Sequence, residues 1–181
     1  MFHDPVSFPP IERGGIRRLT AGEVHLASSL YGYSIQYHRV WIHRASYLPF
    51  NMQLNNVAMT PNGELYFQEG TYKNDFFMSP VESQHLFLHE MMHVYQHQRG
   101  MWVRTRGLFS WAAEYDYTLD KDQLSDYSME QQACIVSDYW LLINHGFYRY
   151  DHLYRLRNYK PSSSEDALIQ RYQHILRDFP A

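Results

Sequence analysis

The spacing of hydrophobic residues predicts four helices along the chain. In each of them, hydrophobic side chains recur every three or four positions, which places them on one face of a helix. Three of the four begin with a serine or threonine that is followed three residues later by a glutamate, the spacing of a capping box, at Thr20, Ser79 and Ser162. The predicted helices span residues 20–32, 80–98, 124–145 and 162–179.

A small β-sheet is predicted between the first two helices. Residues 37–43 are rich in aromatic and β-branched side chains, which favour an extended strand. Residues 57–60 and 64–67 are the expected arms of a hairpin, because Pro61-Asn62-Gly63 between them is typical of a turn. Helices combined with a small sheet in this order predict an α+β domain.

The N-terminal residues differ from the rest of the chain. Several prolines and a glycine pair within residues 1–18 predict an extended arm or linker. Residues 19–181 are enough for one domain with its own hydrophobic core. The first residues lack the basic start and apolar run of a secretory signal, and no stretch is apolar enough to predict a membrane span. We therefore expect one folded domain, made without a Sec-type signal.

Four histidines recur at every fourth position of the second predicted helix: His85, His89, His93 and His97. Four residues advance about 400° around a helix axis, so the first and last histidines end about 120° apart and cannot meet at one ion. Only His89 and His93 enclose a glutamate directly after the first histidine, Glu90, which gives the HExxH pattern. Both imidazoles can reach a single Zn²⁺ because they lie one turn apart. We predict His89 and His93 as zinc ligands and Glu90 as the catalytic base.

A catalytic zinc ion also needs a third protein ligand and an open position for water. Acidic candidates lie downstream of the motif: Glu114, Asp116, Asp126, Glu130 and Asp138. Glu130 is preferred, because its neighbours on the helical wheel are small and mostly uncharged, and a charge on such a face needs a partner. Asp138 lies about 80° from that face and is expected to accept a hydrogen bond from a ligand imidazole. His85 and His97 are more typical of structural residues or of the wall of a cleft.

Composition narrows the possible partners. A net charge of -3 and a pI near 6.4 argue against a basic surface for nucleic acid. The single cysteine, Cys134, excludes an intramolecular disulfide and a zinc site built from cysteines. Metal ligands in this chain are therefore expected to be histidines and carboxylates.

Six stretches of the sequence carry a resemblance to a known family. They are Leu19–Glu23, Val40–His43, Tyr47–Phe50, Ala58–Glu64, His85–Gln98 and Glu130–Gln132. Together they resemble the zincin metallopeptidase domain found at the C-termini of type VI secretion spike proteins (VgrG) and in related stand-alone effectors. Many unrelated zincins share HExxH. The Met-Thr-Pro-Asn-Gly hairpin and the His-Gln after the motif make this resemblance more specific.

The resemblance implies a gluzincin-like site in which His89, His93 and Glu130 bind zinc and Glu90 is catalytic. The implied fold is a small, antiparallel-rich sheet packed on the HExxH helix and on a second long helix. The implied role is a toxin that leaves by type VI secretion and acts in the periplasm of a competing bacterium. Its implied partners are a VgrG spike and an immunity protein. In thermolysin-like gluzincins an aspartate follows the glutamate ligand by four residues, whereas this chain has Cys134 there.

The expected reaction is metal-assisted hydrolysis of an amide bond. Glu90 takes a proton from the attacking water and returns it to the leaving amine. A group that stabilises the developing oxyanion is also expected, and Tyr127, Tyr95, His97 and Arg104 are available. The sequence does not choose among these four.

Three functions stay open at the level of sequence. The first is a peptidase for a protein substrate, and the second is an amidase or endopeptidase that applies the same site to peptidoglycan stem peptides. In the third, a closed zinc site only holds the helices together and the surface binds a partner. That third function predicts a fourth protein ligand, His85 or His97, in place of water.

Overall fold

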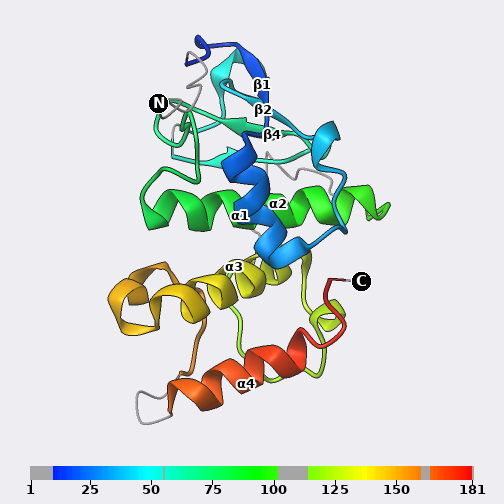
Figure 1. Cartoon of the computed structure of the whole chain (residues 1–181), viewed down its shortest axis with the longest axis vertical. Helices are drawn as coiled ribbons and strands as arrows, with labels where there is room; N and C mark the ends of the chain where they lie inside the picture. The colour runs from blue at the N-terminus through cyan, green and yellow to red at the C-terminus, as the bar shows by residue number, and fades with distance from the viewer. Residues whose placement is uncertain (1–9, 55, 102–113, 160–163, 181) are drawn as a thin grey trace, which may run out of the picture.

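The computed structural model of the chain describes residues 10–54, 56–101, 114–159 and 164–180. Its α-helices are α1 (Ala21–Tyr31), α2 (Val81–Gln98), α3 (Met129–His145) and α4 (Glu165–Ile175). Figure 1 shows a small sheet at one end of the molecule, α2 beneath it, α3 on the opposite side of α2, and α4 beyond α3. The architecture is therefore α+β, as predicted.

The sheet has four short strands in the order β1-β2-β4-β3. They are β1 (Ile16–Arg18), β2 (Trp41–His43), β3 (Ala58–Met59) and β4 (Leu65–Phe67). β1 and β2 pair antiparallel, as do β3 and β4, whereas β2 and β4 pair parallel, so the sheet is mixed. The predicted hairpin is confirmed, and Gly63 in its turn has a φ of 72°, which glycine adopts at little cost. β3 lies at the edge of the sheet.

The segment predicted as an arm contributes to the sheet. Residues 16–18 form β1, and the backbone of Gly14 and Gly15 exchanges hydrogen bonds of 2.8 and 3.0 Å with Arg44. Three-residue strands have too few positions for an alternating pattern, so the sequence gives little sign of β1. The boundary of the folded domain at residue 18 stays a prediction.

The strand predicted over residues 37–43 is shorter than expected. Tyr37–Arg39 form a 3₁₀ helix, η1, and β2 begins only at Trp41. The Tyr37 hydroxyl donates a hydrogen bond to the carbonyl oxygen of Gly32 (2.9 Å). This bond holds Tyr37 against the end of α1, away from the sheet.

α1 begins at the predicted capping box. The Thr20 hydroxyl accepts a hydrogen bond from the backbone N–H of Glu23 (3.0 Å), and the Glu23 carboxylate accepts one from the backbone N–H of Thr20 (2.9 Å). Glu23 is fully buried and also accepts two hydrogen bonds from the Arg17 guanidinium (2.7 and 2.8 Å) and one from the N–H of Phe76 (3.0 Å). One carboxylate thus joins β1, α1 and the segment before α2.

The start of α2 differs from the prediction. Pro80 is the N-cap residue, the helix begins at Val81, and no side chain caps it. The capping box predicted from Ser79 and Glu82 is therefore wrong. The Ser79 hydroxyl instead donates to the carbonyl oxygen of Asp75 (2.6 Å), which holds it in the preceding turn.

The rest of α2 follows the prediction. The helix ends at Gln98, and Gly100 follows with a φ of 74° and donates its N–H to the carbonyl oxygen of His97 (2.9 Å). Leu88 and Met91 in the middle of the helix are fully buried. The helix that carries HExxH is thus held between the sheet and α3.

The start of α3 also needs correction. Leu124–Asp126 form a separate 3₁₀ helix, η4, and α3 begins at Met129. Ser128 is the N-cap residue and forms a capping box with Gln131. One helix from residue 124 was predicted because the helical spacing of apolar residues continues through η4, which hides the break. The predicted end at Gly146 is confirmed, since this residue is the C-cap.

α4 begins at Glu165, after an N-cap at Ser164 whose hydroxyl accepts the N–H of Ala167 (3.1 Å). The N-cap is thus Ser164, and the capping box predicted from Ser162 and Glu165 involves Ser162, which lies outside the described residues. The helix ends at Ile175, four residues earlier than expected. α4 packs on α3, and Tyr172 of α4 is fully buried.

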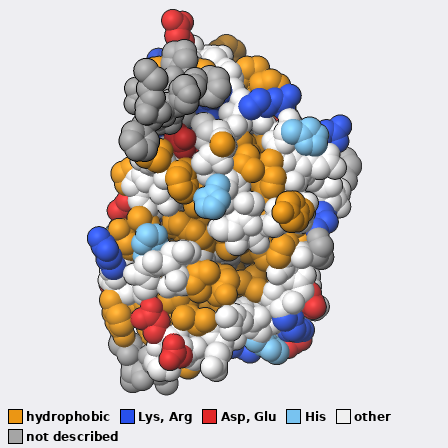
Figure 2. Space-filling model, viewed as in Figure 1, with side chains coloured by type: hydrophobic (Ala, Val, Ile, Leu, Met, Phe, Trp, Pro, Cys, Tyr) orange, Lys and Arg blue, Asp and Glu red, His pale blue; other side chains and the backbone are white. Residues whose placement is uncertain are grey.

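The described parts of the connecting segments also contain the 3₁₀ helices η2 (Pro49–Asn51) and η5 (Tyr148–Leu153). On the face shown in Figure 2, hydrophobic side chains spread across the middle, and basic and acidic side chains lie in small separate groups around them. Among the helices of the described ranges, none combines the length and the apolar character needed to cross a lipid bilayer.

Replacing Glu23 with alanine should lower the free energy of unfolding by about 3 kcal/mol or more, because the Arg17 guanidinium and two backbone N–H groups lose their acceptor. Chemical denaturation followed by circular dichroism measures the change. Glu12→Ala, at an exposed position, is the control and should change the free energy by less than about 0.5 kcal/mol. Equal stabilities of the two variants would contradict the role of Glu23.

Candidate metal centre

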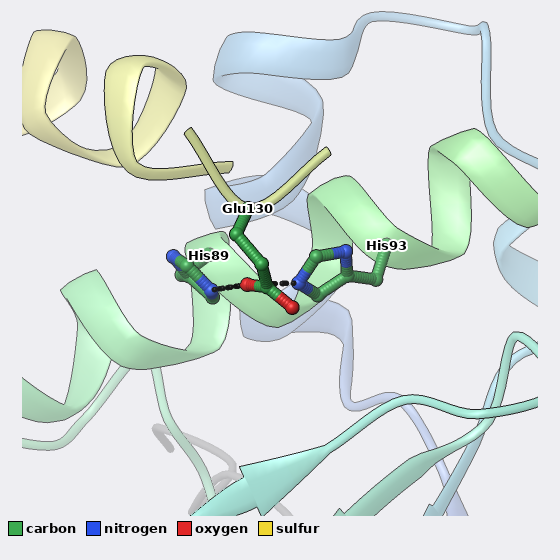
Figure 3. A group of neighbouring side chains, drawn as sticks. All are labelled: His89, His93 and Glu130. Atoms are coloured by element: carbon green, nitrogen blue, oxygen red, sulfur yellow. Dashed lines mark hydrogen bonds and ion pairs between the residues drawn. The ribbon is translucent and has the colours of Figure 1, made fainter. Parts of the chain in front are cut away.

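Three side chains from two helices meet between α2 and α3. His89 and His93 lie one turn apart on α2, and Glu130 projects from the first turn of α3 between their rings (Figure 3). Glu130 Oε2 lies 3.3 Å from His89 Nε2 and 3.1 Å from His93 Nε2. The exposed fraction of the side chain is 32% for Glu130, 12% for His89 and 6% for His93. The group is therefore shielded from most of the solvent but remains accessible.

The donor atoms of these three residues have the spacing that a zinc ion requires. All three lie within 4.8 Å of one another. Ligand atoms about 2.0–2.1 Å from a tetrahedral Zn²⁺ are about 3.3–3.4 Å apart, which is close to the Nε2–Oε2 distances of 3.3 and 3.1 Å. Two imidazoles and one carboxylate also form a common donor set of catalytic zinc sites. The residues present thus fit a zinc ion.

Gln96 fixes which nitrogen of His93 faces Glu130. The Gln96 amide nitrogen donates to the carbonyl oxygen of Met129 and to Gln132 Oε1, both at 3.1 Å, which leaves Gln96 Oε1 as an acceptor. That oxygen accepts a hydrogen bond from His93 Nδ1 (2.8 Å), so Nε2 is the nitrogen directed at Glu130. His93 is therefore held in the orientation that coordinates a metal through Nε2.

The Glu130 carboxylate favours a positive charge beside it, which a proton or a metal ion can supply. Burial lowers the pKa of His93, but the hydrogen bond and charge of Glu130 outweigh burial and raise this pKa to about 9. Burial also raises the pKa of Glu130, but hydrogen bonds from His89 and His93 outweigh it and hold this pKa well below its usual range. Near neutral pH a proton thus lies between carboxylate and imidazole, and a metal ion has to displace it.

Cys134 lies one turn after Glu130 and contacts the other imidazole, with its sulfur 3.8 Å from His89 Nδ1. Burial raises the pKa of the Cys134 thiol, so the sulfur stays protonated near neutral pH. The neighbour of His89 is therefore a neutral thiol, a weak hydrogen-bonding group, at the position where thermolysin-like sequences have a carboxylate.

Glu90 lies beside the metal-ligand candidates, and only 5% of its surface is exposed to solvent. The Thr60 hydroxyl donates a hydrogen bond of 2.6 Å to Glu90 Oε2. Thr60 directly follows β3, so the hairpin positions a carboxylate that α2 carries. Within the described ranges, Glu90 Oε1 has no hydrogen-bond partner and remains available.

A cavity of about 470 Å³ runs past these side chains. Residues 48–60 form a mostly apolar part of its wall. Residues of α2 and α3, Tyr115 and residues 152–155 form the rest. His89, Glu90, His93 and Glu130 all line this space, which is large enough for a small ligand or part of a peptide.

Asp138 does not accept a hydrogen bond from His89 or His93, so that prediction is wrong. It is fully buried, and its Oδ1 accepts from His85 Nε2 (2.8 Å). Its Oδ2 accepts from the Tyr117 hydroxyl (2.7 Å) and the Arg155 N–H (2.9 Å). Helical-wheel angles on α3 do not reveal which turn of α2 lies opposite Asp138. In the structure it is the turn of His85, one turn before the HExxH motif. His85 lines the cavity, as expected.

The residues expected to assist an oxyanion lie elsewhere. Tyr127 is buried and donates its hydroxyl hydrogen to a backbone carbonyl of the preceding loop (2.8 Å), and Tyr95 is buried in the hydrophobic core. His97 is exposed, with its ring against Gly63 in the hairpin turn. None of these three side chains lines the cavity. Arg104 lies outside the described residues.

The remaining acidic candidates for a third ligand have other surroundings. Asp116 pairs with Arg157 (2.7 Å), Asp126 caps η4, and Glu114 is exposed. In the part of the chain that the structure describes, Glu130 is the acidic residue that joins His89 and His93.

Three cavity residues were not expected from the sequence: Thr60, Tyr115 and Arg155. Thr60 belongs to the Met-Thr-Pro-Asn-Gly hairpin, and that motif is a signal that could have identified it. Tyr115 has its ring centroid 6.3 Å from that of His89. Neither Tyr115 nor Arg155 lies in a segment with helical or strand periodicity, so their sequence context carries no comparable signal.

Comparisons with known proteins give two matches. No protein-family model matches the sequence. The chain is 38% identical over 180 residues to the type VI secretion system spike protein VgrG2b of Pseudomonas aeruginosa. This similarity takes in 95% of the chain but only 16% of the length of the spike protein.

The solved structure of the effector domain of P. aeruginosa VgrG2b is similar to this chain at a TM-score of 0.65 and 34% sequence identity. The match covers 82% of this chain and 88% of that domain. Sequence and fold therefore agree over most of both chains. The chain belongs to the family of the VgrG2b effector domain, which is associated with the spike protein of type VI secretion.

Proposed function

We propose that the chain is a zinc-dependent peptidase of the zincin type that hydrolyses amide bonds as an effector of type VI secretion. The observation that carries this proposal is the meeting of His89, His93 and Glu130 on the wall of a cavity that also contains Glu90. The first three residues would hold the zinc ion, which supplies a Lewis acid that polarises a carbonyl and lowers the pKa of water.

Glu90 is the proposed general base. Thr60 holds Glu90 Oε2 by a hydrogen bond of 2.6 Å and so fixes the plane of the carboxylate. Oε1 then accepts a proton from the attacking water and passes it to the leaving amine. The low exposure of Glu90 keeps bulk water away from this transfer.

Tyr115 is the proposed donor to the oxyanion, in place of the residues predicted from the sequence. It lines the cavity beside His89, and its hydroxyl makes no hydrogen bond with the described residues. Burial, and then the charges of Glu130 and Glu90, raise the pKa of the Tyr115 hydroxyl well above its usual value. The hydroxyl therefore stays protonated and can donate to an oxygen that gains negative charge.

The proposed substrate lies as an extended peptide along β3. This strand is at the edge of the sheet, and Val57–Thr60 line the cavity. An extended peptide can add to such an edge through backbone hydrogen bonds, which brings its amide bonds past α2. The strand would thus align the scissile bond with Glu90.

A purely structural zinc site is less well supported. That function predicts a fourth protein ligand, His85 or His97. His85 is hydrogen-bonded to Asp138, and His97 lies at the hairpin turn. Among the described residues, neither joins the cluster of His89, His93 and Glu130. A free coordination position suits a reaction better than a structural role.

Delivery is proposed from the comparisons. Similarity to the VgrG2b spike protein supports transport with a VgrG spike into a competing bacterium. Action in the target periplasm, and an immunity protein that protects the producing cell, complete this proposal. Peptidoglycan stem peptides are the second candidate substrate, because they combine amide bonds with free carboxylates and the cavity contains an arginine.

Purified chain should contain one zinc ion, and Glu90→Gln should retain it while losing at least about 100-fold in hydrolysis and its toxicity in the periplasm of a susceptible bacterium. Glu130→Ala should weaken zinc binding by at least about 100-fold, because it removes a ligand. Metal analysis and toxicity assays measure these effects, with the exposed Glu114→Ala as control. Full toxicity of Glu90→Gln would refute the proposed base.

Tyr115→Phe should lower kcat by about 100-fold and change KM by less than about threefold, because the hydroxyl acts on the transition state. Zinc content should stay the same. Steady-state kinetics on a cleaved peptide measures both constants. Tyr127→Phe is the matched control, since that hydroxyl is bound to a loop carbonyl away from the cavity. An unchanged kcat for Tyr115→Phe would exclude the proposed donor.

A further inference from the structure

Arg155 is held rigidly at the wall of the cavity. Its backbone N–H donates to Asp138 Oδ2 (2.9 Å), and its carbonyl oxygen accepts the N–H of Tyr117 (3.2 Å). Asp138 is fully buried and also receives His85 Nε2 at 2.8 Å. The backbone of Arg155 is therefore anchored to the same carboxylate that positions a cavity histidine on α2.

The charge of the Arg155 guanidinium is poorly compensated. Its nearest carboxylate oxygen, Asp116 Oδ1, lies 4.0 Å away. Asp116 is already paired with Arg157, which makes two contacts of 2.8 and 2.7 Å to Asp116 Oδ2. Within the described residues the Arg155 guanidinium makes no hydrogen bond, and its side chain is 55% exposed.

Among the described residues that line the cavity, Arg155 is the one with a lysine or arginine side chain. The acidic residues of the lining have other roles: Glu130 faces the two imidazoles, Glu90 is bound by Thr60, and Glu82 is exposed on the first turn of α2. The wall formed by residues 48–60 is mostly apolar. A ligand in this space thus has both apolar surface and a weakly paired guanidinium within the same lining.

We infer that Arg155 binds a carboxylate of the substrate, so that preferred substrates carry an acidic side chain or a free terminal carboxylate within a few residues of the bond that is cut. A guanidinium presents a planar fork of N–H donors that matches a carboxylate in two parallel hydrogen bonds. The position of this carboxylate relative to a cleaved bond rests on the proposed hydrolytic function. Binding of the carboxylate by Arg155 does not.

The test measures binding and hydrolysis separately. Short blocked peptides of alanine and leucine carry one glutamate, moved through every position, and each is paired with the same peptide carrying glutamine. A second pair differs only in a free or an amidated C-terminus. Binding to the zinc-loaded Glu90→Gln protein is followed by nuclear magnetic resonance titration, and hydrolysis by the unaltered protein is followed by mass spectrometry.

The expected result is about tenfold tighter binding of the carboxylate peptide at one position or at the C-terminus. In the Glu90→Gln background, Arg155→Gln should abolish this preference and Arg155→Lys should restore part of it. Arg149→Gln, which makes the same charge change on η5 outside the cavity lining, should leave it intact. Zinc content and thermal stability of each variant identify any general loss of structure.

Two outcomes overturn the inference: no carboxylate preference at any position, or a preference that Arg155→Gln retains. Hydrolysis without a carboxylate preference would leave the proposed peptidase in place and remove the role of Arg155. A carboxylate preference that depends on Arg155, in a protein that cleaves none of the peptides, would establish the binding site and count against the proposed peptidase.

Discussion

The close packing of α3 along α2 brings a carboxylate of one helix within 3.3 Å of two imidazoles of the other. Ala133 and Ser137 are small, fully buried and on the same face of α3 as Glu130, which lets the two helices approach. A slip of one turn, about 5.4 Å, would separate Glu130 from His89 and His93. The candidate metal centre therefore depends on the register between these helices.

Buried polar side chains maintain that register. Gln96 of α2 binds both the backbone and a side chain at the start of α3, and Asp138 of α3 binds His85 of α2. Glu23 connects α1 and β1 to the segment before α2. In the described residues, every buried side-chain nitrogen or oxygen has a hydrogen-bond partner. Such satisfied networks specify one arrangement, because each displaced partner leaves a costly buried group unpaired.

The features that could be predicted from the sequence are those that depend on residue spacing within one segment. HExxH indicated His89 and His93, and the small, uncharged neighbours of Glu130 indicated this residue. The three side chains do meet, whereas their zinc binding stays a prediction. The same reasoning could not find the partner of Asp138 or the approach of Tyr115, because both depend on contacts between segments far apart in the chain. The helix starts also differ from the prediction. Pro80 rather than Ser79 is the N-cap of α2, and a Ser128-Gln131 capping box starts α3 after the predicted position.

We propose that His89, His93 and Glu130 hold one cation between α2 and α3. X-ray absorption at the zinc edge of the purified, zinc-loaded chain tests this coordination. Coordination by these three residues predicts a first shell of nitrogen and oxygen at about 2.0–2.1 Å, with the outer-shell signature of two imidazoles and no sulfur. A sulfur ligand at about 2.3 Å, which would implicate Cys134, or a single imidazole would contradict it.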